Sequence, residues 1–173
     1  IKRIIYVLAV SLLLIFNLAC CKKNNAQEST FALENQFSSD VAVKYNDISA
    51  SLSMQSYGAG CCKFVFLSPE ALNGMSFEFT PEAINIGYKT LHTSLSPQAM
   101  PKTAICKQLI TVLKAAAGEG VNKKLADGML ILSGALAGSE FIVRVDKKSG
   151  KIISLEVPNE KFEAEFSDFC FIK

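Results

Sequence analysis

Apolar and polar residues alternate along most of the chain after residue 40, with the two-residue period of β-strands that have one solvated face. The clearest run is residues 48–55, in which isoleucine, alanine, leucine and methionine face one way and serine and glutamine face the other. At Ser167 and Asp168 the apolar positions change parity, which predicts a β-bulge. The alternation predicts strands near residues 41–45, 48–55, 61–67, 75–79, 84–95, 129–136, 141–146, 153–157 and 162–171.

Between Ile105 and Ala117 the pattern changes to the three- and four-residue spacing of an amphipathic helix. Its apolar stripe is broad, so we expect this helix to be covered on most of its circumference. The polar residues 118–128 that follow predict a loop. The sequence therefore predicts an α+β domain, with one antiparallel sheet of about nine or ten strands and one main helix packed on one face.

The first 21 residues have a different pattern, which is typical of a bacterial export signal. Lys2 and Arg3 precede an apolar run that extends to Phe16, and the pair Cys20 and Cys21 follows shortly after. Because the run leads to cysteine instead of a small-residue cleavage site, it indicates a lipoprotein signal, in which the cysteine receives a diacylglyceryl group. Cys21 is slightly favoured over Cys20. The alternatives are an ordinary secretory signal and a transmembrane anchor, although an anchor needs about 20 apolar residues.

This pattern divides the chain into a signal peptide at 1–20, a tether at 21–37 and a lipoprotein domain at 38–173. We expect the mature protein to lie on the extracytoplasmic face of the cell membrane and to be held there by its covalent lipid. Two or more acyl chains anchor a protein firmly, whereas one chain binds only marginally.

Charge narrows the choice of partners. Without Lys2 and Arg3, 16 basic residues remain against 16 acidic ones, so the exported domain is formally neutral. Recognition of nucleic acid depends on a clustered basic surface, and we therefore expect no nucleic-acid partner. Half of the residues are apolar and twelve are phenylalanine, which is ample material for one core.

Four cysteines follow the anchor region, at Cys61, Cys62, Cys106 and Cys170. An exported protein can form disulfides, but the adjacent pair makes an awkward framework because neighbours on a strand face opposite ways. We interpret the cysteines mainly as buried free thiols, with a disulfide between Cys106 and Cys170 as the alternative. No C-x-x-C spacing is present, so no metal site is predicted.

Residues that suggest catalysis have simpler interpretations. His92 is the single histidine of the sequence and lacks the nucleophile motifs of a hydrolase. Glu163 and Glu165 share one face of a predicted strand at about 7 Å, but their surroundings are those of a solvated edge. We therefore predict a protein that is not an enzyme and that binds no cofactor or metal.

Two segments carry a resemblance to a known superfamily. Residues 62–79 resemble the strand, Pro-x-x-Leu-x-Gly turn and next strand of the lipoprotein-carrier (LolA-like) superfamily, and residues 141–155 resemble the Asp-x-x-(Ser/Thr)-Gly hairpin common near the end of those domains. The chain looks most like the small lipoproteins of unassigned function in clostridia and their relatives. The resemblance implies a curved, unclosed antiparallel half-barrel, with helical cover on its concave face and an apolar cavity beneath.

The resemblance implies a membrane-anchored lipoprotein that binds a lipid or other apolar ligand between sheet and helix. The alternative is a non-catalytic module that binds an envelope or sporulation protein. Large aromatic side chains at inward positions first of all fill the core between sheet and helix, and lining of such a cavity is the alternative. The candidate cavity residues are Phe64, Phe66, Phe77, Phe79, Leu109, Phe141, Phe162 and Phe166.

Overall fold

The computed structural model describes residues 35–58, 60–102 and 104–172. The predicted signal peptide, the attachment cysteines Cys20 and Cys21 and most of the predicted tether lie outside the described residues. The strands are β1 (Phe37–Tyr45), β2 (Ile48–Gly58), β3 (Cys61–Ser68), β4 (Ser76–Phe79), β5 (Ile84–Tyr88), β6 (Leu91–Leu95), β7 (Asn122–Ala126), β8 (Met129–Leu136), β9 (Ser139–Asp146), β10 (Ile152–Val157) and β11 (Phe162–Phe171). Helix α2 (Ile105–Ala117) and the 3₁₀ turns η1 (Glu70–Leu72) and η2 (Pro158–Glu160) complete the elements.

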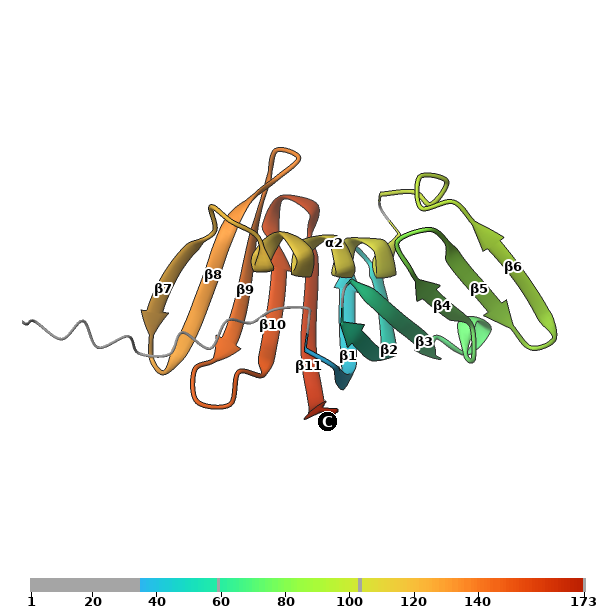
Figure 1. The fold of residues 1–173 in the computed structure, drawn as a ribbon, viewed down its shortest axis with the longest axis horizontal. Helices are drawn as coiled ribbons and strands as arrows, with labels where there is room; N and C mark the ends of the chain where they lie inside the picture. Colours follow the sequence, from blue (N-terminus) through green and yellow to red (C-terminus); the bar gives the residue numbers. More distant parts are fainter. Residues whose placement is uncertain (1–34, 59, 103, 173) are drawn as a thin grey trace, which may run out of the picture.

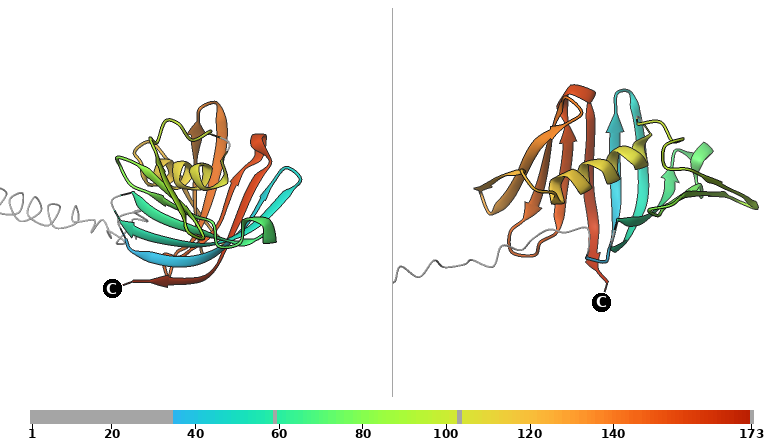
Figure 2. Two further views of the ribbon diagram at one scale, coloured as in Figure 1. Left: turned by 90° about the vertical axis from the view of Figure 1, so that its right-hand side faces the viewer. Right: turned by 45° about the horizontal axis from the view of Figure 1, so that its top comes forward.

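All of these strands belong to one sheet, in the order β6-β5-β4-β3-β2-β1-β11-β10-β9-β8-β7, and every pair is antiparallel. The sheet curves and stays unclosed, with β6 and β7 at its two ends (Figures 1 and 2). Helix α2 links those two strands and crosses the concave face on the way (Figure 1). The predicted fold, a curved unclosed sheet around one main helix, is confirmed.

The first and last strands meet in the middle of the sheet, where the predicted bulge is found. β1 pairs with β11, and the register slips at Ser39, opposite Asp168 and Phe169. Asp168 has a positive φ of 50°, and the Ser39 hydroxyl donates to the Ser167 carbonyl at 2.6 Å. The bulge turns Phe169 inward, where its ring stacks on Phe37 with the centroids 4.6 Å apart. Phe37, one residue before the predicted domain start at residue 38, is a buried residue of β1.

Helix α2 packs against the concave face through the predicted apolar stripe. Leu109, Val112 and Leu113 are fully buried, and Cys106 and Ala116 extend the buried face by one turn in each direction. The bounds of α2 coincide with the predicted ones. Helix α2 crosses the concave face of a curved sheet, so the sheet flanks the helix on both sides. This explains why the apolar stripe of the helix is broad.

The hairpin predicted at residues 146–150 is present between β9 and β10. One Asp146 carboxylate oxygen accepts hydrogen bonds from the backbone N–H of Ser149 at 2.7 Å and from its hydroxyl at 2.6 Å. These hydrogen bonds lower the pKa of Asp146. Gly150 closes the turn with a φ of 70°, a conformation that favours glycine.

Two predictions about the strands were wrong in detail. The sheet has eleven strands, not nine or ten, and residues 118–128 include strand β7 where a loop was predicted. β7 lies at the sheet end and pairs with β8 alone, so most of its side chains face solvent and show no buried alternation. Its two lysines, Lys123 and Lys124, are typical of an edge strand that resists pairing with other chains.

The contact between α2 and the sheet can be tested by truncating its central leucine. Leu109→Ala should lower the free energy of unfolding by about 2–5 kcal/mol, because the substitution leaves a cavity in a packed core. Lys114→Ala, at an exposed position of the same helix, should change it by less than about 0.5 kcal/mol. Urea unfolding followed by circular dichroism measures both values. Equal values for the two variants would contradict the packing described here.

Candidate functional site

A cleft with a volume of about 800 Å³ opens beside α2. It lies next to the β8–β9 and β10–β11 turns, whose place in the fold can be followed in Figure 1. Its apolar lining comes from three elements: Val112 of α2, Leu136 and Phe141 of the β8–β9 hairpin, and Val157 at the end of β10. Val112, Phe141 and Val157 are buried. The volume falls within the range of about 300–1,000 Å³ that is usual for small-molecule sites.

Phe141 owes its place in the cleft to a glycine on the neighbouring strand. Gly134 lies opposite Phe141 in the β8–β9 ladder. A Cβ atom at Gly134 would lie 2.9 Å from the Phe141 ring, closer than a carbon contact allows. The glycine therefore lets the ring lie flat against β8 beside the cleft. A larger residue at position 134 would push the ring away from the strand.

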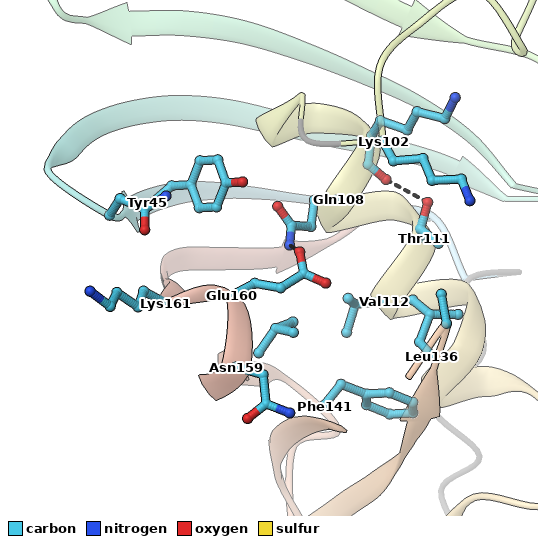
Figure 3. Close-up of a pocket in the computed structure, with 14 residues that line it drawn as sticks. Tyr45, Lys102, Gln108, Thr111, Val112, Leu136, Phe141, Asn159, Glu160 and Lys161 are labelled. Atoms are coloured by element: carbon cyan, nitrogen blue, oxygen red, sulfur yellow. Dashed lines mark hydrogen bonds between the residues drawn. The ribbon is translucent and has the colours of Figure 1, made fainter. Parts of the chain in front are cut away.

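Polar side chains form the remaining walls (Figure 3). The β1–β2 turn is held to the β10–β11 turn, because the Asn46 backbone N–H donates to the Lys161 carbonyl at 3.1 Å. The polar residues at the cleft are Tyr45, Asn46, Lys102, Lys107, Gln108, Thr111, Asn159, Glu160 and Lys161.

Two contacts organise these walls. The Gln108 side chain reaches from α2 to η2, where its Nε2 donates to the Glu160 carboxylate (Figure 3). The Lys107 ammonium donates to the carbonyls of Pro97 and Met100, at 2.8 Å and 2.5 Å, and so fixes the segment that leads into the helix. The cleft thus combines an apolar floor with a polar mouth, which suits an amphiphilic ligand better than a purely apolar one.

The structure brings one of the eight candidate cavity residues, Phe141, to this cleft. Phe64 and Phe79 make an edge-to-face contact with ring centroids 5.7 Å apart, and Phe66 and Phe77 do the same at 5.9 Å. These rings pack on one another over one face of the paired strands β3 and β4 and do not line the cleft. Leu109, Phe162 and Phe166 are also buried in the core, and Phe166 borders a separate pocket of about 520 Å³.

The residues that were considered for catalysis lie at the surface of the structure. His92 is exposed on the end strand β6, and Glu163 and Glu165 are exposed on the outer face of β11. Arg144 forms an ion pair with Glu156 across β9 and β10. Among residues 35–58, 60–102 and 104–172, no group of three His, Cys, Asp or Glu side chains could hold a metal ion.

No protein-family model matches the sequence, and no curated protein matches it significantly. Solved structures do match, and a protein of Thermus thermophilus described as uncharacterised is 11% identical over 82% of this chain and 81% of its own, with a TM-score of 0.55. A chain in the complex of the CwlD amidase with the GerS lipoprotein of Clostridioides difficile is 19% identical over 79% and 86%, with a TM-score of 0.52. A LolA superfamily protein of Nitrosomonas europaea is 9% identical over 81% and 87%, with a TM-score of 0.44. At these identities the likeness shows the fold alone.

The four cysteines of the domain are free, so the alternative of a disulfide between Cys106 and Cys170 was wrong. Cys106 lies on the buried face of α2, whereas Cys170 is exposed on β11, beyond the bulge. Burial raises the pKa of Cys62 to about 11 and that of Cys106 to about 12, because a thiolate loses its hydration inside the core. These two thiols are therefore protonated and inert at neutral pH.

The raised pKa values predict a loss of stability in alkali. Above about pH 9 the unfolded chain releases its thiol protons while the folded core retains them, so the free energy of unfolding falls as pH rises towards 11. For Cys106 this loss should be on the order of 2 kcal/mol at pH 10.5. Denaturant unfolding at pH 8 and pH 10.5 should show a smaller decrease for Cys106→Ala than for the unmodified protein. Cys170→Ala serves as the exposed control, and identical decreases in all three proteins would contradict the prediction.

Proposed function

We propose that this protein is a lipid-anchored, extracytoplasmic binding protein, and that the cleft beside α2 takes an amphiphilic ligand with an acyl chain. The observation that carries the proposal is the apolar floor of the cleft, where Val112, Phe141 and Val157 meet beneath a polar mouth. An acyl chain in the cleft would lie against this floor and cover the half-buried Leu136 beside it, which removes the apolar surface of Leu136 from water. The role is one of binding and not of catalysis.

The shape of the domain supports this site over the phenylalanine-lined space predicted between sheet and helix. The aromatic side chains of β3 and β4 pack on one another and belong to the same core cluster as the helix. The pocket that Phe79 lines against α2 has a volume of only about 170 Å³, below the usual range of a small-molecule site. The cleft, by contrast, is already open between α2 and the β8–β9 and β10–β11 turns. A ligand can bind there without repacking, which suits a preformed site.

A second candidate function, binding of an envelope protein, is favoured by the two ends of the sheet. β7 carries Lys123 and Lys124, whereas β6 is free of Lys, Arg, Asp and Glu and leaves Leu91 72% exposed. An end strand without such charges suits pairing with a strand of a partner protein. The complex between the CwlD amidase and the GerS lipoprotein gives a precedent in which a lipoprotein binds a protein partner.

Anchoring is the part of the proposal that rests on the sequence alone. Among the described residues, no helix combines the length and the apolar character needed to cross a bilayer. The proposed anchor is the lipid on Cys21 or Cys20, which would hold the cleft close to the membrane that supplies its ligand. Two acyl chains suffice for stable attachment.

The anchor can be tested by replacing both cysteines. The double variant Cys20→Ser and Cys21→Ser should lose metabolic labelling with radioactive palmitate, because serine cannot form the thioether to diacylglycerol. It should also leave the membrane fraction or retain its uncleaved signal. Single replacements identify the residue that is modified. Palmitate labelling that persists in the double variant would contradict the anchor.

The binding site can be tested by filling the cleft from an exposed position. Thr111 lines the cleft and is exposed on α2, so Thr111→Trp should occupy part of the volume without disturbing the core. Fluorescence titration with an acylglycerol probe should show at least about tenfold weaker binding than to the unmodified domain, a loss of about 1.4 kcal/mol. Ala117→Trp, on the exposed last turn of the same helix, is the matched control. No saturable binding by the natively folded, unmodified domain would favour the protein-binding alternative.

A further inference from the structure

Gln108 is a buried polar residue in the apolar face of α2. Its side chain is 6% exposed, and its neighbours Leu109 and Val112 belong to the core. The amide extends from the helix into the cleft, towards Glu160 of η2 (Figure 3). Buried amides normally satisfy both their donor and their acceptor groups.

Chemistry fixes the orientation of this amide. The ionised Glu160 carboxylate can accept hydrogen bonds but cannot donate them, so the Gln108 Nε2 must be the atom that faces it. The other end of the amide, the Oε1 atom, is buried and has no hydrogen-bond partner among residues 35–58, 60–102 and 104–172. An acceptor left in this state is unfavourable unless a donor reaches it.

We propose that Gln108 Oε1 and the Glu160 carboxylate form a polar subsite that accepts hydrogen bonds from a hydroxyl group on the ligand. This inference rests on the proposed function, because the subsite would orient the headgroup of the amphiphile whose acyl chain covers Val112 and Phe141. The Gln108 Nε2 atom contacts the carboxylate and Oε1 lies at the other end of the same amide, so the two acceptors are separate. A glycerol-like group matches them because its hydroxyls donate in two directions.

The charges around the subsite favour an uncharged headgroup. The Glu160 carboxylate repels a carboxylate or phosphate placed directly against it. A cationic headgroup is disfavoured in turn by Lys102 and Lys161, which line the same cleft. A neutral hydroxyl avoids both penalties and supplies the donor that Oε1 lacks.

The experiment uses photo-crosslinking, because it works on the full chain in its lipid environment. The full-length protein is placed in lipid nanodiscs with one of two probes that carry the same diazirine-labelled acyl chain. One probe is a monoacylglycerol with both hydroxyls free, and the other is its dimethyl ether, which has no donor. Peptide mass spectrometry then quantifies crosslinks to the cleft residues. We expect about fivefold more crosslinking by the hydroxylated probe, the effect of one neutral hydrogen bond.

The variant Gln108→Leu removes one of the two acceptors while keeping a similar volume, so it should reduce the preference for the hydroxylated probe, because only the Glu160 carboxylate remains to accept a hydrogen bond. Gln55→Leu, the same replacement on the outer face of β2, should leave the preference unchanged. If Gln108→Leu fails to fold, the ratio of the two probes on the unmodified protein still decides the question. Equal crosslinking by both probes to the unmodified cleft overturns the hydroxyl subsite and leaves the proposed function standing. No crosslinking of either probe to the cleft overturns the proposed function as well.

Discussion

The contact between the apolar stripe of α2 and the concave face of the sheet determines the rest of this structure. Eleven antiparallel strands at about 4.8 Å spacing make a sheet nearly 50 Å wide along its curve. A helix of 13 residues is about 20 Å long. One helix that crosses the strands therefore covers less than half of the inner face, and the remainder must be filled by side chains, exposed, or used for binding.

Filling by side chains, exposure and binding are each found in a different part of the inner face. On β3 and β4 the inward positions are phenylalanines, whose rings pack on one another and close the space. At the ends, Leu91 of β6 and Leu125 of β7 stay more than half exposed. Beside α2, between the β8–β9 and β10–β11 turns, the floor is apolar but the walls stand apart, and this is the cleft. The proposed site is thus a consequence of a sheet that is wider than its cover.

The sequence predicted the parts of the fold that periodicity controls. The helix at Ile105–Ala117 and the bulge at Ser167 and Asp168 were predicted correctly because their apolar residues contact the core. β7 was missed because it has one neighbouring strand and few buried side chains. Its formation depends on backbone hydrogen bonds to β8, and these do not produce a pattern of apolar and polar side chains in the sequence.

The candidate site was harder to predict, because its walls come from turns far apart in the sequence. Alternation identifies Phe64 and Phe141 equally as inward residues, and the register and the course of α2 decide that Phe141 alone reaches the cleft. One feature of the sequence could have indicated the site: Gln108 is a polar residue beside Leu109 in an apolar helical stripe. In the structure Gln108 is buried, and its side chain donates a hydrogen bond to Glu160.

The most direct test of the central claim is a map of where an amphiphile binds. Two-dimensional NMR spectra of the isotope-labelled domain, titrated with monolauroylglycerol below its micelle concentration, report each backbone amide separately. If the cleft is the binding site, saturable shifts should cluster on α2, the β8–β9 turn and η2, with little change on β4 and β5. Shifts confined to the β4–β6 part of the sheet, or no saturable shifts in a folded domain, would contradict it.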